Sequence, residues 1–430
     1  MISNTEKSTG SQGELGPVRV WALAAGGMVG GGIYIALGVV IAVAAQWAWL
    51  SFVISGVIAV CTAYSYARVS NHYKRSGGAF EFLEEMDRQG IAGSLSWLLI
   101  LGYTLTIAVY TFAFGHYLAY SIGGGPAVIR AFAIGIGIAL IGLNLVGIGK
   151  MTAVEVVIVT ANLVVLLILG LIGICNWDST QLLAGIEPRT PWSASVGAAA
   201  IFVSYEGFQL LTYEYEKVKS PEKYFLPVLV SAAIFVVFVY VLVALGATML
   251  AGALAIVEEK QVALSIAAEN VGGTAGLVVM TIAAAFATAA AINSTLFSTG
   301  KLAARVARDH ELPGWFSHQN RFGVPDRPII AIGIVATLLS VLGSLSALVE
   351  AASLVFLAAF FIVNLTCFQL ADSNRWIPLT GIIVGAMIGV VLVARLIVTA
   401  PISLAVLVLL SLVATLGRSA ILRWLKSKEE

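Results

Sequence analysis

Long runs of apolar residues, separated by short polar or Gly/Pro-containing breaks, make up most of this chain. A helix of roughly 20 apolar residues crosses the hydrocarbon core of a membrane, whereas the strands of a membrane barrel alternate apolar and polar residues over about ten positions. The runs lack that alternation and predict an all-α membrane protein of about twelve transmembrane helices. The predicted helices are residues 19–45, 48–69, 92–122, 126–147, 152–175, 194–213, 226–254, 273–305, 328–345, 347–371, 376–398 and 400–420.

The composition excludes a water-soluble fold. The 430 residues are 59% hydrophobic and 11% charged, with a mean hydropathy of +0.96. An ordinary soluble domain carries roughly 25% charged residues. The net charge of +1 gives no indication of a nucleic-acid partner, so the partner that this composition predicts is the lipid bilayer.

The basic residues predict the orientation, because cytoplasmic loops are enriched in Lys and Arg. With both ends on the same side, 20 of the 24 basic residues fall on that side. We therefore expect a multi-pass plasma (inner) membrane protein with cytoplasmic termini. Residues 1–18, which lack the pattern of a cleaved signal peptide, and residues 421–430 are expected to be cytoplasmic tails, the first of them disordered. The basic residues left on the other side are Arg130, Arg189, Lys260 and Arg395.

The first predicted helix carries a cluster of five glycines at about mid-membrane depth, between Gly26 and Gly32. Each glycine weakens a helix interior by about 1 kcal/mol relative to alanine, so we expect the helix to unwind there. Free backbone N–H groups beside the following half-helix would favour a carboxylate. The alternative is close helix packing, which normally uses glycines along one stripe rather than all round the helix.

The sixth predicted helix has a second interruption, from Phe202 to Phe208, with Glu206 at its centre. An ionisable side chain at mid-membrane depth costs a few kcal/mol, so it is expected to face a cavity and to mark a function. The alternative is a structural glutamate paired with a neighbouring helix.

Two broken helices, five spans apart, are typical of inverted five-helix repeats with a binding site at the membrane midplane. A substrate between them would place a carboxylate on the amides of the first break. Its ammonium group would lie near the carbonyl groups of the second break and near Glu206.

Four stretches of the chain resemble the amino acid-polyamine-organocation superfamily of transporters, in order and at the family's spacing. The resemblance covers residues 19 to about 370 and does not identify the substrate. The matching stretches are Gly26–Tyr34; Ser76–Phe80; Phe202–Phe208 followed by Glu216–Pro221; and Asn293 followed by Arg305–Pro313.

The resemblance implies a LeuT-type fold with two repeats, residues 19–175 and 194–371, and an appended pair of helices at 376–420. It also implies a substrate site built from the two breaks. The residues expected to approach the substrate carboxylate are Gly27, Met28, Gly30, Gly31 and Gly32. Those expected on the amine side are Val203, Ser204, Tyr205 and Glu206, and Gly207 completes the second break.

Ion coupling is where the chain departs from some members of the superfamily. Some proton-coupled members have a lysine in helix five, and the matching position here is Asn162, which cannot carry a proton. The stretch 283–291 of the eighth predicted helix supplies too few hydroxyl oxygens for a sodium ion. Glu206 then remains as the candidate proton carrier, and it could equally stay ionised and neutralise a cationic substrate.

Polar residues elsewhere in the spans are expected to have structural roles. Asparagine amides can link helices by hydrogen bonds across the membrane. Glu350, near the outer end of the tenth helix, is expected to reach interfacial water. The asparagines expected to link helices are Asn144, Asn293 and Asn364.

Together these features predict a secondary active transporter that moves amino acids by alternating access, through proton-coupled symport or substrate exchange. Cationic amines or polyamines are the alternative substrates. A channel or an intramembrane enzyme is disfavoured, since the sequence has no HExxH or GxSxG motif and no intramembrane carboxylate pair. The pattern predicts no cofactor and no metal, with protons and a small molecule as the other partners, and it leaves the oligomeric state open.

Overall fold

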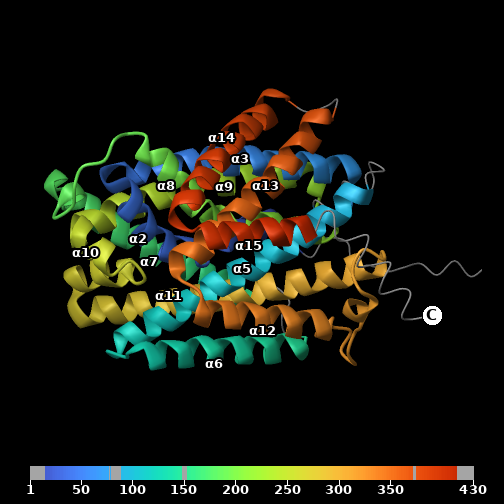
Figure 1. The fold of residues 1–430 in the computed structure, drawn as a ribbon, viewed down its shortest axis with the longest axis horizontal. Helices are drawn as coiled ribbons and strands as arrows, with labels where there is room; N and C mark the ends of the chain where they lie inside the picture. The colour runs from blue at the N-terminus through green and yellow to red at the C-terminus, as the bar shows by residue number, and fades with distance from the viewer. Residues whose placement is uncertain (1–14, 77, 79–88, 148–152, 371–373, 414–430) are drawn as a thin grey trace, which may run out of the picture.

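The computed structural model describes residues 15–76, 78, 89–147, 153–370 and 374–413 (Figure 1). Within these ranges the chain is helical, apart from loops and one isolated β-bridge. The predicted tail residues 1–14 and 421–430, and residues 77, 79 and 80 of the second matching stretch, lie outside the described ranges. The α-helices are α1 (Pro17–Val29), α2 (Gly32–Ala44), α3 (Ala48–Tyr73), α5 (Gln89–Ser121), α6 (Pro126–Leu145), α7 (Ala153–Cys175), α8 (Ser193–Ile201), α9 (Pro221–Ala251), α10 (Ala253–Glu258), α11 (Ala263–Arg308), α12 (Asp326–Leu342), α13 (Leu345–Gln369), α14 (Trp376–Thr399) and α15 (Pro401–Leu412). The 3-10 helices are η1 (Ala45–Trp47), η2 (Ser179–Leu183), η3 (Phe202–Tyr205), η4 (Phe208–Lys217) and η5 (Gly314–Ser317).

Each of the twelve predicted spans corresponds to one helix or to two or three helical pieces in the described residues. The first is divided into α1 and α2, and the sixth into α8, η3 and η4. These two broken elements therefore begin successive sets of five spans, and α14 and α15 follow as the appended pair. The fold class is thus confirmed.

The main differences between the predicted and the observed helices lie at the helix ends. The helix α11 begins at Ala263, ten residues before the predicted start, and changes direction at Gly273, whose φ is 56°. The adjacent Gly272 and Gly273 interrupt the apolar run, and for this reason the sequence pattern placed the start of the helix there. The short helix α10 was not predicted.

Residues 15–18, which were predicted to belong to a disordered tail, have a defined structure. Residues 15–18 are structured, because Pro17 occupies the first position of α1, where its missing N–H costs no hydrogen bond. Leu15 forms the isolated bridge with Val218: its N–H donates to the carbonyl of Lys217 (3.0 Å), and its carbonyl accepts from the N–H of Lys219 (2.9 Å). This bridge joins the start of α1 to the end of η4.

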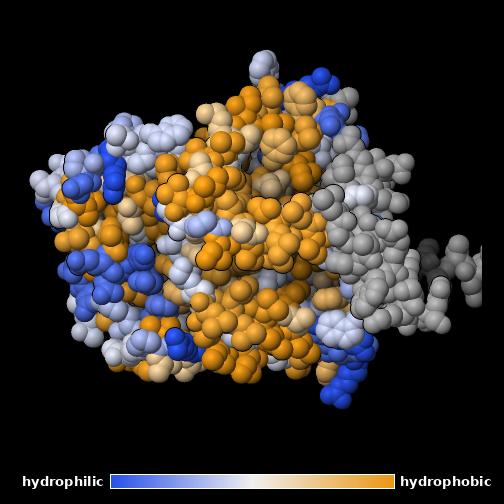
Figure 2. All heavy atoms as spheres, in the orientation of Figure 1, coloured by the Kyte–Doolittle hydropathy of each residue, from blue (hydrophilic) through white to orange (hydrophobic). Residues whose placement is uncertain are grey.

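On the face shown in Figure 2, apolar residues cover the middle of the molecule, and hydrophilic residues gather at the end that carries α10 (Figures 1 and 2). Among the described residues, nine helical stretches are long and apolar enough to cross a membrane. The two ends of the helix bundle differ in charge. We call the end that carries Lys74, Lys217, Lys301, Arg308 and Arg375 the basic end, and the other, with Arg130, Arg189, Lys260 and Arg395, the opposite end.

The three asparagines link helices as predicted. The side-chain amide of Asn144 in α6 donates to the Asn293 amide oxygen in α11 over 3.0 Å. Asn364 in α13 donates to Thr62 (2.8 Å) and accepts from Ser65 (2.7 Å), both in α3. These bonds join spans that are far apart in sequence.

The expectation that Glu350 reaches water is wrong. Its side chain is 3% exposed and pairs with the Arg395 guanidinium of α14, 23% exposed, at 3.0 Å. The pair fixes α14 against α13, because a carboxylate buried at this depth needs a hydrogen-bonding cation.

We expect Arg395→Leu to destabilise the protein more than Glu350→Leu. Removing the arginine leaves the nearly buried carboxylate unpaired, at a cost of roughly 3–5 kcal/mol, whereas an arginine left alone can still reach water at its exposed side. The double substitution should recover much of the loss. Thermal unfolding of the purified variants measures this, and equal losses for the two single variants would contradict it.

Candidate functional site

The first break is shorter than predicted. α1 continues through Gly26, Gly27 and Met28 to Val29, and α2 starts at Gly32, so only Gly30 and Gly31 separate the two helices. The first N–H groups of α2 have no acceptor within their own helix, as at any helix start, and they point into the break. The start of a helix can bind an anion, and binding of a substrate carboxylate at this break stays a prediction.

Glycines of this cluster also permit close packing, both outside and inside the break. A Cβ atom on Gly26, in α1, would lie 2.3 Å from a Val159 methyl carbon of α7, and one on Gly30, in the break, would lie 2.7 Å from the Ala291 Cβ of α11. The unwinding and the packing interpretations therefore both apply to this cluster, and Gly30 serves both.

The second break is a non-helical linker at Glu206 and Gly207. α8 ends at Ile201, and the 3-10 turn η3 leads to Glu206 in an extended conformation (φ −70°, ψ 148°). Gly207 follows with φ 129°, a conformation that a residue with a side chain rarely adopts, and η4 then begins at Phe208. The carboxylate therefore sits between two helical pieces, on a non-helical peptide.

The two breaks are in direct backbone contact. A Cβ on Gly207 would lie 2.4 Å from the carbonyl oxygen of Gly27, and a Cβ on Gly32 would lie 2.6 Å from the carbonyl oxygen of Ser204. Only glycine permits this approach. The Tyr240 hydroxyl of α9 lies 2.7 Å from both the Met28 and the Ser204 carbonyl oxygens and so connects the two breaks from the side.

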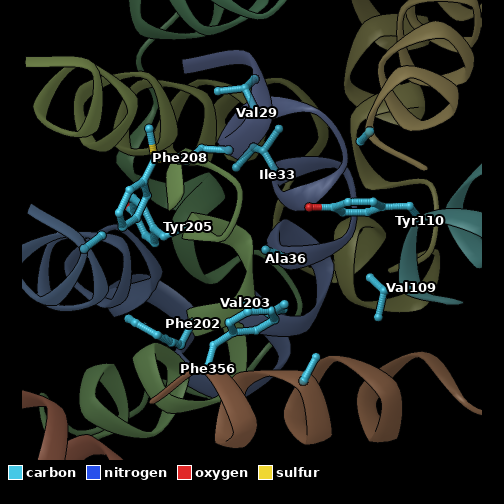
Figure 3. Close-up of a cluster of buried hydrophobic side chains, with 14 of the residues drawn as sticks. Val29, Ile33, Ala36, Val109, Tyr110, Phe202, Val203, Tyr205, Phe208 and Phe356 are labelled. Atoms are coloured by element: carbon cyan, nitrogen blue, oxygen red, sulfur yellow. The ribbon is translucent and has the colours of Figure 1, made fainter. Parts of the chain in front are cut away.

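Glu206 is buried, with 1% of its surface exposed, and its carboxylate accepts two hydrogen bonds. The Gln209 side-chain amide donates over 2.9 Å, and the Tyr110 hydroxyl of α5 donates over 3.5 Å. Figure 3 shows the Tyr110 hydroxyl pointing from α5 toward the broken first helix. The Gln209 amide oxygen accepts from the Gly207 N–H (2.9 Å), which fixes the orientation of the amide.

Within the described part of the chain, no Lys, Arg or His side chain forms an ion pair with this carboxylate. Two neutral donors stabilise an ionised carboxylate less than a cation does at this depth. The carboxylate of Glu206 is therefore buried without a cationic partner among the described residues, and it can bind a positive charge.

Asn162 joins α7 to the first break. Its side-chain oxygen accepts a hydrogen bond from the Tyr34 hydroxyl of α2, and its amide nitrogen donates to the Val29 carbonyl of α1 over 3.4 Å. One neutral side chain thus connects both halves of the broken helix.

Three residues predicted on the amine side have their polar groups bonded within the protein. The Tyr205 hydroxyl donates to the Phe52 carbonyl of α3, and the Ser204 hydroxyl to the Ile201 carbonyl, each over 2.7 Å. The Val203 N–H donates to the Ser353 hydroxyl of α13 over 3.0 Å. A role for these three residues in binding stays a prediction, while the geometry brings the glycines, Ser204 and Glu206 together.

The sequence pattern does not single out Tyr110 or Tyr240, because aromatic side chains in apolar spans commonly pack between helices or face lipid. A buried tyrosine in a membrane span needs a partner for its hydroxyl, which is the signal that could have identified them. The sequence does not identify which group each hydroxyl bonds to, because it does not determine the rotation of α5 and α9 about their axes.

Comparisons with known proteins agree with this architecture. The family model described as amino acid permease matches residues 15–419. The inner membrane transport protein YbaT of Escherichia coli is 26% identical over 84% of this chain and 85% of its own. Cationic amino acid transporter 3, mitochondrial, of Arabidopsis thaliana is 26% identical over 80% of this chain, which spans 60% of that longer protein. The crystal structure of MhsT in complex with L-phenylalanine superposes with a TM-score of 0.61 at 16% identity, covering 87% of this chain and 97% of MhsT, and so shows a LeuT-type fold.

Proposed function

The chain belongs to the amino acid permease family and is an amino acid transporter of the membrane, and we propose that it works by alternating access at the contact of its two broken helices. The observation that carries this mechanism is the buried Glu206 beside the backbone contact of Gly27 with Gly207. No step of the mechanism is a chemical conversion of the substrate.

The proposed orientation places the basic end in the cytoplasm and the opposite end outside the plasma membrane. The enrichment of Lys and Arg at the basic end supports it. α1 and η4 then form the inner halves of the broken helices, and α2 and α8 the outer halves. Opening toward the cytoplasm requires α1 to leave η4, which breaks the Leu15 bridge to Val218 and the glycine contact.

The substrate's carboxylate binds the N–H groups at the start of α2, where the helix dipole favours an anion. The carboxylate of Glu206 binds a positive charge during the transport cycle. A proton is the first candidate for that charge. Protonation would make the carboxyl neutral and would let the two breaks close without a buried, unpaired charge.

A second candidate is a cationic amino acid or amine as the partner of Glu206. Among the residues that the structure describes, no cation pairs with the carboxylate, which favours this candidate because the substrate would then supply the missing charge. The plant relative carries the words cationic amino acid transporter in its name.

Uptake of labelled neutral and cationic amino acids into proteoliposomes tests this function. We expect at least one amino acid to accumulate or to exchange, and a pH gradient to drive uptake if the proton is the coupled ion. An absence of accumulation and exchange for every amino acid and amine, with and without a gradient, would overturn the proposal.

Asn162 holds the two halves of the first broken helix and carries no proton, so we expect Asn162→Ala to slow transport by the same factor at every pH. The substitution leaves the buried Tyr34 hydroxyl without its partner, at a cost of about 1–3 kcal/mol. Adding Tyr34→Phe removes the orphaned hydroxyl and should restore part of the stability. Uptake and thermal unfolding of the single and double variants measure both effects, and a change in the shape of the pH profile would assign Asn162 a part in coupling instead.

A further inference from the structure

Arg19 of α1 and Glu155 of α7 are two charged side chains of opposite sign that the proposed substrate site does not use. Both are half-buried. Among the described residues neither side chain forms an ion pair, and the buried Nε atom of Arg19 has no hydrogen-bond partner. Removing a charged group from water without a partner is costly. An arrangement in which the two groups meet would relieve that cost for both.

Two contacts define the register of α1 against α7. The side-chain amide of Asn162 donates to the Val29 carbonyl over 3.4 Å, and these residues are 133 positions apart in the chain. A Cβ atom on Gly26 would lie 2.3 Å from a methyl carbon of Val159, and this pair has the same separation in the chain. Equal separations mean that the two helices run parallel and that residues separated by this number lie level with each other.

This register places Glu155 level with Ala22, one helical turn from Arg19. Arg19 and Ala22 are three residues apart, so they share a face of α1 and lie about 4.5 Å apart along its axis. Glu155 is four residues before Val159 and so lies on the face of α7 that contacts α1. The charge of Arg19 acts on the Glu155 carboxylate. The two groups are therefore neighbours that lie too far apart to form an ion pair in this structure.

The tight contact at Gly26 determines how α1 can move. Consecutive residues of a helix point about 100° apart, so Gly27 faces Gly207 of the sixth span while Gly26 faces α7. Because no space is left at Gly26, α1 cannot shift toward α7 as a whole, and its inner end leaves η4 by tilting about this contact. Arg19 lies seven residues, or about 10 Å, from this pivot, so a tilt moves its guanidinium group past Glu155.

We propose that Arg19 and Glu155 form an ion pair when the inner side of the transporter opens, and that this pair stabilises the open state. The proposal rests on the proposed function, in which α1 leaves η4. That movement breaks the Leu15 bridge to Val218, and the new pair offsets part of the loss. Both charged residues are positioning residues, since they act on α1 and not on the substrate.

The open state can be measured by the reactivity of a cysteine at Val218, which is 2% exposed and bridges to Leu15. The purified full-length protein carries Val218→Cys together with Cys175→Ser, because Cys175 is exposed whereas Cys61 and Cys367 are buried. A water-soluble maleimide reaches position 218 only in molecules in which α1 has left η4. The labelling rate therefore reports the fraction of open molecules when opening and closing are fast.

Arg19→Gln and Glu155→Gln are each expected to slow labelling about fivefold, because the open state loses one half-buried ion pair. The exchanged pair, Arg19→Glu with Glu155→Arg, should restore the rate to within about twofold of the parent protein, since the two charges can still meet. Lys74→Gln is the matched control. It breaks an exposed ion pair with Glu222 at the same end and should be labelled at the parent rate.

The melting temperature of the single variants separates this role from a structural one. It should not fall, because the pair is not formed in the closed state. A fall, an unchanged or faster labelling rate in both single variants, or no recovery in the exchanged pair would overturn the proposal. Labelling needs no amino acid, so a failure of uptake in proteoliposomes, which would overturn the proposed function, leaves the labelling result intact.

Discussion

Substitution of Gly207 by alanine is expected to reduce amino acid transport by about 10- to 100-fold or more. The alanine would have to adopt φ 129°, a strained conformation that costs about 1–3 kcal/mol, and each 1.4 kcal/mol corresponds to a tenfold change. Its Cβ would also lie 2.4 Å from the carbonyl group of Gly27, which is backbone and cannot turn away. The two broken helices must then separate, and the proposed substrate site loses its geometry.

Gly135→Ala in α6 is the matched control, because a Cβ there meets no atom within 4 Å and the residue is helical. We expect this control to transport like the wild type. Uptake into proteoliposomes, normalised to the amount of folded protein, measures both variants. Transport by Gly207→Ala within a factor of two of the control would show that the contact with Gly27 is dispensable.

Glu206→Gln is expected to remove the pH dependence of transport and to lower uptake of a cationic substrate on the order of 100-fold. Glutamine is nearly isosteric and can still accept a hydrogen bond from Gln209, but it can neither take up a proton nor neutralise a cation. A charge at mid-membrane depth without its partner costs roughly 2.5–3.5 kcal/mol on insertion scales, which corresponds to about two orders of magnitude.

Neutral and cationic amino acids separate the two roles of this carboxylate. If Glu206 carries the proton, the variant transports neutral amino acids at a rate independent of pH. If Glu206 neutralises the substrate, neutral amino acids are affected less than cationic ones. Glu269→Gln, which changes a carboxylate at the opposite end near Tyr120, is the control and should keep the wild-type pH profile. A Glu206→Gln profile that matches this control would remove Glu206 from the mechanism.

The glycine cluster shows how far local chemistry can predict a site. Glycine weakens any helix, so the break in the first span was predictable, yet five glycines gave a break of only two residues. Gly26 and Gly27 remain helical, and the close approach of Val159 and of Gly207 accounts for glycine at these two positions, because a Cβ there would collide with them. Helix weakening is a property of one segment, whereas close packing depends on which segment lies opposite.

The charged side chains show the same division. That Glu206 lies in a break of the sixth span follows from the sequence, and so does the excess of basic residues on one side. That Glu206 meets Tyr110, 96 residues away, and that Glu350 pairs with Arg395 rather than water, follows only from the packed helices.

The sequence by itself determined the spans and the two broken helices, because every membrane helix must be apolar along its own length and must hydrogen-bond its own backbone. The order and spacing of its motifs indicated the family. The tertiary structure alone decided the partners of the polar groups. Asn162 with Tyr34, Tyr240 between the two breaks, and Lys301 with Glu214 depend on the rotation and crossing of helices far apart in the chain. Lipid is equally favourable to many rotations, so apolar pattern does not fix them; close backbone contacts and buried hydrogen bonds do.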